Sequence, residues 1–200
     1  RRLITREQVL TPQGSVVADT KTTYDNLSDA NCTLAYSLTD VMTTLQRDPA
    51  YGTSLATRGN PRCVSRWRSS SLGWVTVGMS YDTAGNLLQR RDERGYSTSF
   101  DYTDQYETGF PPAPTKSLVT SITNPRGHVT RWWYDYGTGK PSRHQDPNSV
   151  QTTYSYADPL DRLTGAARGA YESVSFLYQD AQRQVTMRRD LNAANDQARQ

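Results

Sequence analysis

The stretch GHVTRWWYDYGTG, residues 127–139, decides the fold, because its pattern returns in SVQTTYSYADPLDRL, residues 149–163. Both stretches begin at a turn of the Pro or Gly type, alternate Thr with aromatic residues up to a tyrosine, and then break into a second turn. The tyrosines Tyr134, Tyr156 and Tyr178 follow one another at intervals of 22 residues. A fixed period of this size is the signature of a repeat architecture.

The tyrosine that closes each copy, here called the anchor tyrosine, also occurs upstream. Tyr81 and Tyr102 are 21 residues apart, and Tyr102 and Tyr134 are 32 apart, which is the same period lengthened by about ten residues. In all five copies a β-former lies four residues before the anchor and a large apolar residue two before it, the period of two that is typical of a strand. The five triplets are Val77/Met79/Tyr81, Thr98/Phe100/Tyr102, Thr130/Trp132/Tyr134, Thr152/Tyr154/Tyr156 and Val174/Phe176/Tyr178.

Turn residues bracket these strands in register. Gly95, Gly127 and Ser149 stand seven residues before an anchor, and the sequences DTAGN, DYGTG and ADPLD follow the anchors. Gly suits such turns because it readily adopts positive φ, and Pro because its φ is preset. The chain is therefore predicted to be all-β, built from antiparallel β-hairpins of about 22 residues with strands of roughly 7 residues, or ~23 Å.

The composition supports an ordered but polar chain. Of the 200 residues, 34% are hydrophobic and the mean hydropathy is −0.80, yet 10% are aromatic, including 13 Tyr and 4 Trp. Disordered segments are poor in aromatic and β-branched residues. An ordered, β-rich structure without a conventional core is the better interpretation.

The charge pattern argues against nucleic acid as a partner. The formal charge is +3, and its basic residues are spread along the chain without a run of five or more. No run of about 18 apolar residues is present, so we predict no membrane span. No signal peptide is visible either, and we expect the sequence to be an excerpt from a longer protein.

Cys32 and Cys63 are the only cysteines. They would form a disulfide in an oxidising compartment, but two cysteines do not define a disulfide framework. We therefore expect two free or partly buried thiols.

The pattern divides the chain into three parts. Residues 1–73 are predicted to be an irregular, degenerate repeat segment, in which the repeat pattern is weakest over residues 26–57. The stretch LAYSLTDVMTTLQ, residues 34–46, has spacings that suit an amphipathic helix, but we expect strand or irregular structure there. Residues 74–189 are predicted to form the β-strip, with an exposed Pro-rich insertion at 104–117. Residues 190–200 form a polar tail.

The anchor Tyr81-Asp82-Thr83-Ala84-Gly85-Asn86-Leu87 resembles the YD repeat of the bacterial RHS family, which also occurs in insecticidal toxin-complex shells and teneurins. Residues 123–163 resemble two consecutive RHS units with a D/N-P-x-G/S-x-x-T-x-x-Y core. The resemblance covers about residues 74–180. The chain departs from the family pattern in the spacing after Asp135, in Asp161 in place of a Gly, and in Gln179-Asp180 after the last anchor.

The resemblance implies a strip of hairpins wound into a hollow shell that encloses a polypeptide such as a C-terminal toxin, or into a large extracellular barrel. It further implies a secreted or cell-surface protein whose partners are the flanking YD repeats of its own chain. From the residues themselves, we expect the aromatic rows of successive hairpins to stack into ladders. Each anchor tyrosine would pack its ring and keep its hydroxyl in water.

No catalytic, cofactor-binding or metal-binding residue is predicted, and the chain is not expected to be an enzyme. His128 and His144, with Asp135 and Asp146 nearby, lack the further ligands of a zinc site and are interpreted as surface or turn residues. Asp82 and Asp135, which follow anchors, and Asp25, which follows Tyr24 at the end of an imperfect first unit, are expected to accept backbone N–H bonds in turns. The serines at 69–71 have no nucleophile motif around them.

The four tryptophans support an alternative function, an extracellular carbohydrate or cell-wall binding module. Trp67, Trp74, Trp132 and Trp133 could stack on sugars, although only Gly73-Trp74 forms the Gly-Trp module of aromatic hairpin repeats. Trp133 lies on the opposite side of its strand from Trp132 and has no aromatic counterpart in the other copies. We expect any partner outside the sheet to contact Trp133.

Overall fold

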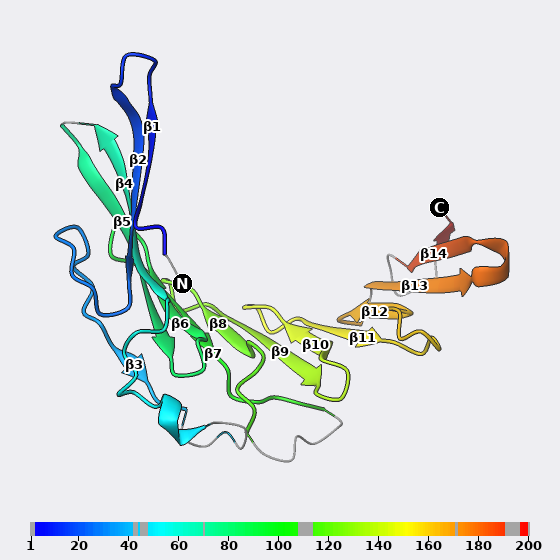
Figure 1. Ribbon diagram of the computed structural model, residues 1–200. Helices are drawn as coiled ribbons and strands as arrows, with labels where there is room; N and C mark the ends of the chain where they lie inside the picture. Colours follow the sequence, from blue (N-terminus) through cyan, green and yellow to red (C-terminus); the bar gives the residue numbers. More distant parts are fainter. Residues whose placement is uncertain are drawn as a thin grey trace.

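The chain forms one open, curved β-sheet, shown in Figure 1. The computed structural model describes residues 3–41, 44, 48–69, 71–107, 114–170, 172–190 and 197–199. Apart from two short 3-10 helices, its regular elements are strands, so the predicted all-β class is confirmed. The strands are β1 (Arg6–Leu10), β2 (Val16–Tyr24), β3 (Leu38–Thr39), β4 (Pro61–Ser69), β5 (Gly73–Asp82), β6 (Leu87–Arg91), β7 (Ser97–Asp101), β8 (Ser121–Thr123), β9 (Val129–Asp135), β10 (Lys140–Gln145), β11 (Gln151–Ser155), β12 (Gly165–Arg168), β13 (Glu172–Gln179), β14 (Gln184–Asp190) and β15 (Gln197–Arg199); the helices are η1 (Pro49–Tyr51) and η2 (Asp180–Gln182).

Each strand pairs antiparallel with the strand that follows it in the sheet, in the order β1, β2, β4 and then β5 to β15. Strand β3 lies off this path and pairs in parallel with the end of β5. The hairpin units predicted from the 22-residue period are therefore present, one unit being an anchor strand and the strand after it. Residues 1–73 contribute β1, β2 and β4 to the same sheet.

The register between units is constant. Positions are numbered from the anchor tyrosine, so that Trp132 is at position −2 and Thr152 at position −4 of their units. Trp132 pairs with His144, and His144 pairs with Thr152. Crossing two strands therefore leads from position −2 of one unit to position −4 of the next. The same step occurs from Met79 to Thr98, from Phe100 to Thr130, from Tyr154 to Val174 and from Thr22 to Val77. Each unit is thus shifted by two residues along the strand direction relative to its neighbour.

This stagger corrects the predicted aromatic ladders. The large residues at position −2 are not opposite one another, because an intervening strand lies between them and the register moves by two residues per unit. A constant stagger tilts strands relative to the direction in which the sheet grows, by about 35° for ~3.3 Å per residue and ~4.8 Å between strands. The strip therefore has the geometry of a winding sheet and not of a flat ribbon.

Two long insertions interrupt the regular units at the same structural position, directly after an anchor strand. The first insertion, residues 25–60, joins β2 to β4, and the second insertion, residues 102–120, joins β7 to β8. One residue of each insertion pairs in parallel with the anchor tyrosine of the next unit: Leu38 pairs with Tyr81, and Tyr106 forms a bridge with Tyr134. Both insertions therefore lie at the same edge of the strip, the edge at which the anchor strands end.

The described residues of the first insertion are irregular apart from β3 and η1, as expected, and a disulfide joins the insertion to the sheet. Cys32 in the insertion forms a disulfide with Cys63 of β4, with a Cα–Cα distance of 5.7 Å. The expectation of free thiols is therefore wrong: strand pairing places Cys63 on the side of the sheet that the insertion crosses. Met42 and Leu45 of the ambiguous stretch 34–46, Pro111 and Pro112, and most of the tail 190–200 lie outside the described residues.

The sheet has almost no conventional core. Among the described residues, the buried hydrophobic side chains are Val41 and Cys63, and the other buried side chains are polar or charged. A single sheet layer leaves both faces uncovered over most of its length, which is why the residues at positions −2 and −4 are only partly buried. Among the described residues, no helix is long and apolar enough to cross a membrane.

Candidate functional site

The hairpin turns share one hydrogen-bonding pattern. In four of them an Asp or Asn side chain accepts bonds from the backbone N–H groups two and four residues later, at 2.8–3.0 Å. The residue three positions after it has positive φ. The acceptors are Asp82, Asp92, Asn124 and Asp146, and the positive-φ residues are Gly85, Gly95, Gly127 and Ser149.

The turn role predicted for the Asp residues after the anchors is confirmed. Asp25 is 3% exposed and accepts from the backbone N–H groups of residues 58, 59 and 60, which closes the first insertion. Asp82 is 2% exposed and also binds the Asn86 side chain, whose Nδ2 donates to the carbonyl of Lys116 at the end of the second insertion. Asp135 accepts from the backbone of Gly137. The carboxylates therefore organise the backbone.

Four of the five anchor tyrosines bond their hydroxyls to backbone carbonyls, whereas we expected the hydroxyls to remain in water. The hydroxyls of Tyr134, Tyr156 and Tyr178 each donate to the carbonyl 15 residues upstream, at 2.9–3.0 Å. Tyr24 and Tyr81 donate to carbonyls 20 residues upstream. The stagger brings each hydroxyl to the start of the preceding strand, and burial raises the hydroxyl pKa at several anchors.

Two consecutive anchors are also covered by cations. The ammonium of Lys140 lies 5.2 Å from the ring centroid of Tyr156, and the guanidinium of Arg162 lies 4.0 Å from that of Tyr178. Arg162 further bonds both Asp158 and Asp180, and its hydrogen bonds are the main reason that the pKa of Asp158 falls to about 2. These contacts connect one unit to the next, because Asp158 and Asp180 follow different anchors.

The two faces of the sheet differ in chemistry. The anchor face carries the anchor tyrosines and, at position −2, Met79, Phe100, Trp132, Tyr154 and Phe176, with Ile122, Ala166 and Met187 on the strands between them. The polar face is rich in Ser and Thr, with paired rows such as Ser80–Gln89–Ser99–Thr123 and Ser155–Gly165–Ser175. Alternation along the strands thus makes the anchor face the richer in aromatic and apolar residues, although it also carries Arg90 and His144, and makes the other face the richer in hydroxyl groups.

One described residue of each insertion contacts the polar face. Leu34 of the first insertion packs so closely on Gly78 that a Cβ at Gly78 would be 2.9 Å from Leu34 Cδ2. In the second insertion, the carboxylate of Glu107 lies 2.6 Å from Arg143 Nε. Described residues of both insertions also lie beside the anchor tyrosines. Tyr36 and Leu38 line the same hollow as Met79 and Tyr81, and the ring centroid of Tyr106 lies 6.5 Å from that of Tyr136, which is itself 6.4 Å from that of Tyr134.

Trp133 has a partner within the sheet. The guanidinium carbon of Arg143, on the neighbouring strand, lies 3.9 Å from the Trp133 ring centroid, and Arg143 also pairs with Glu107. Trp132, on the anchor face, contacts the ring of His144 at 5.3 Å between centroids. A cross-strand arginine therefore stacks on Trp133, and the expectation that any partner outside the sheet would contact Trp133 stays a prediction.

The histidines and serines considered for chemistry occupy separate places. His128 closes a turn with Asn124, whereas His144 lies in the middle of β10 and not in a turn. Ser69 bonds Ser71 and the backbone of Leu72 at a hairpin tip. In the described part of the chain, no three His, Cys, Asp or Glu side chains lie close enough together to hold a metal ion.

Comparison with known proteins leaves the function open. No family model matches the chain, and no curated protein matches its sequence. It is similar at 16% identity to chains in a crystal structure of TcdB2-TccC3-TEV (TM-score 0.47, 93% of this chain) and in the Photorhabdus luminescens Tc holotoxin pore (TM-score 0.48, 94% of this chain). A crystal structure of TcdB2-TccC3 is similar at a TM-score of 0.46 over 91% of this chain. This chain spans 8% of the length of each of those chains.

Proposed function

We propose that this chain is a wall segment of an RHS/YD-repeat shell, secreted or surface-exposed, that helps to enclose a polypeptide such as a toxin. Its role is structural and not enzymatic. The observation that carries the proposal is the constant two-residue stagger of units whose anchor face is the more apolar of the two. A winding sheet with one apolar face is the form that a large enclosing wall needs.

The exposed edge of the sheet supports further repeats as partners. All five residues of β1 are exposed, and Val9 and Leu10 are 54% and 53% exposed. An unpaired strand edge presents free N–H and C=O groups and readily accepts another strand. In the proposed shell, a flanking YD repeat of the same protein pairs with β1 and continues the same register.

The contrast between the faces supports the orientation of the wall. Apolar surface favours contact with other apolar groups, at ~25 cal/mol per Å² removed from water. Hydroxyl-rich strands tolerate solvent, and Leu34 and Glu107 of the two insertions contact that side. We therefore orient the anchor face toward the enclosed polypeptide and the polar face toward the outside.

Photo-crosslinking in the full natural protein tests this orientation. A photoreactive phenylalanine analogue replaces Phe100 or Phe176 on the anchor face, and in matched variants it replaces Ser99 or Ser175, the neighbouring residues on the polar face. Mass spectrometry then identifies what each position contacts. Crosslinks to an enclosed polypeptide are expected from the two Phe positions and not from the two Ser positions. Equal crosslinking from both faces, or none from the anchor face, would refute the proposal.

A further inference from the structure

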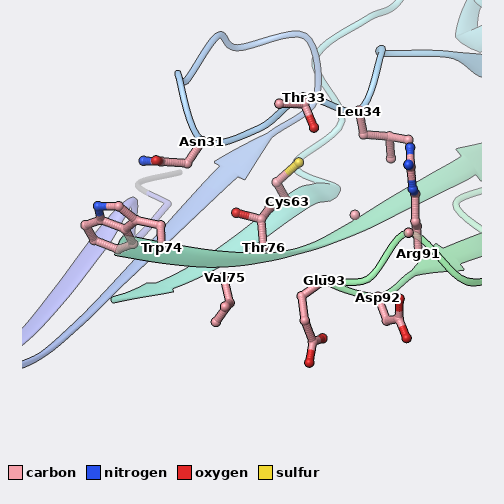
Figure 2. Close-up of a pocket in the computed structure, with 12 residues that line it drawn as sticks. Asn31, Thr33, Leu34, Cys63, Trp74, Val75, Thr76, Arg91, Asp92 and Glu93 are labelled. Carbon is pink, nitrogen blue, oxygen red and sulfur yellow. The ribbon is translucent and has the colours of Figure 1, made fainter. Parts of the chain in front are cut away.

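A small pocket opens where the first insertion crosses β5, shown in Figure 2. Its volume is about 260 Å³. Asn31 and Thr33 of the insertion lie on the same side of β5 as Trp74 and Thr76, and Arg91 extends along one end. The side chains of Asp92 and Glu93, which also line the pocket, lie on the other side of the strand in this view.

The pocket is held in shape by the elements around it. Cys32, between Asn31 and Thr33, forms a disulfide with Cys63 in the floor of the pocket. Leu34, which follows Thr33, packs against Gly78. The insertion also turns on Asp29, whose carboxylate accepts from the Asn31 backbone at 2.8 Å and whose carbonyl accepts from that of Cys32 at 3.0 Å. The site is therefore largely preformed, which reduces the entropy lost when a ligand binds.

The chemistry of the lining favours a polyhydroxylated ligand. The Asn31 side chain has both a hydrogen-bond donor and an acceptor, and the Thr33 and Thr76 hydroxyls can each donate or accept a hydrogen bond. The Arg91 guanidinium can only donate. Trp74 adds an aromatic wall; the Lys21 ammonium lies 4.5 Å from its ring centroid, on one face of the ring. An apolar ligand would leave these polar groups without partners, at a cost in free energy.

We propose that this pocket binds a saccharide, with one sugar ring beside Trp74 and its hydroxyls bonded to Asn31, Thr33 and Arg91. The volume lies just below the ~300–1,000 Å³ typical of sites for drug-sized ligands, which suits a single ring. Each sugar hydroxyl both donates and accepts, as the mixed lining requires. The inference does not rest on the proposed shell function, because the pocket lies on the polar face and the enclosed polypeptide is assigned to the anchor face.

The test begins with the oxidised protein on an array of neutral and acidic glycans, followed by calorimetry on the glycan that binds. Trp74→Ala and Asn31→Leu are each expected to weaken that binding by about tenfold or more, a loss that calorimetry resolves. Trp133→Ala is the matched control, since Trp133 is also a cation-covered tryptophan on the polar face but lies outside the pocket. It should change the affinity less than twofold.

Two further readouts keep the result decisive. Circular dichroism confirms that each variant retains the strand content of the parent protein, and Asn31→Leu stands in if Trp74→Ala does not fold. A mild reductant that opens Cys32–Cys63 is expected to abolish binding, because it frees the residues on either side of Cys32. Failure of the folded, oxidised protein to bind any glycan would overturn the proposal. So would binding that survives both pocket variants, or binding that reduction leaves unchanged.

Discussion

The turn at Ser149 allows a test of how much a left-handed backbone conformation at one turn residue lowers the stability of the repeat. Ser149 and Gly127 occupy equivalent positions in consecutive turns, with φ of 66° and 80°. Both donate their backbone N–H to the Asp or Asn three residues earlier, at 3.0 and 2.9 Å. A Cβ at Gly127 would meet no atom within 4 Å. The two turns therefore differ mainly in whether an L-residue must adopt a left-handed conformation.

The structure sets the size of the effect. A left-handed conformation costs an L-residue about 1–2 kcal/mol. Replacing it by Gly removes that cost but raises the entropy of the unfolded chain, which takes back ~0.4–1 kcal/mol. Ser149→Gly should therefore stabilise the protein by about 0.5–1 kcal/mol, and the reciprocal Gly127→Ser should destabilise it by a similar amount.

Urea unfolding followed by tryptophan fluorescence measures both variants. For an m-value of ~2 kcal/mol per M, the expected shifts in midpoint are about 0.3–0.5 M, upward for Ser149→Gly and downward for Gly127→Ser. Hydrogen exchange at the amide of Val150, which donates to the turn carboxylate of Asp146 at 3.0 Å, gives a local readout. Midpoints that move in the same direction for both variants would refute the assignment of backbone strain to Ser149.

Three further outcomes follow from the anchor units. Asp82→Ala should destabilise the protein by ~3 kcal/mol in urea unfolding. The Asp82 carboxylate is buried and accepts three hydrogen bonds, and a bond to a charged group contributes ~1.5–3 kcal/mol before the surrounding structure relaxes. A loss below about 1 kcal/mol would contradict this prediction. Tyr134→Phe should cost ~1 kcal/mol, since it removes the hydroxyl bond to the Val119 carbonyl and nothing else, and an unchanged midpoint would show that the bond contributes nothing. Stability should fall as the pH drops from 3.8, the ordinary pKa of Asp, toward 2. The hydrogen bonds from Arg162 lower the pKa of Asp158 to about 2. They therefore contribute stability at pH values above 3.8, and this contribution is lost as Asp158 becomes protonated. Arg162→Gln should remove most of this local acid dependence, as measured by thermal unfolding at pH 2 to 6, and an unchanged pH profile would contradict the prediction.

The local features of the repeat could be predicted because they depend on neighbouring residues. Alternation of Thr and aromatic residues indicates a strand wherever it occurs, and Asp or Gly at a turn acts through backbone groups only two to four residues away. The turn role of Asp82 was accessible for that reason. The acceptor of each anchor hydroxyl lies 15 residues upstream in three units, a constant spacing that a longer-range search for regularity could have found.

The residues that misled the prediction depend on contacts between segments distant in sequence. Cys32 and Cys63 are 31 residues apart, across an irregular insertion whose path no periodicity describes. The stacking of Arg143 on Trp133 could not be predicted, because Arg143 belongs to the next strand and faces Trp133 only in the observed register. The pocket beside Trp74 is likewise formed by two segments that the sequence alone does not bring together.

The amino-acid sequence by itself determined that this protein is a series of antiparallel hairpins with one anchor tyrosine in each, because strand alternation and turn formation are decided within a few residues. Only the tertiary structure decided how the hairpins are offset, where the anchor hydroxyls bond and where the described residues of the insertions contact the sheet. Register is set by hydrogen bonds between strands together with turn lengths and bulges, so it is a property of pairs of segments and not of any one of them. The two-residue stagger, on which the proposed shell depends, belongs to that second group.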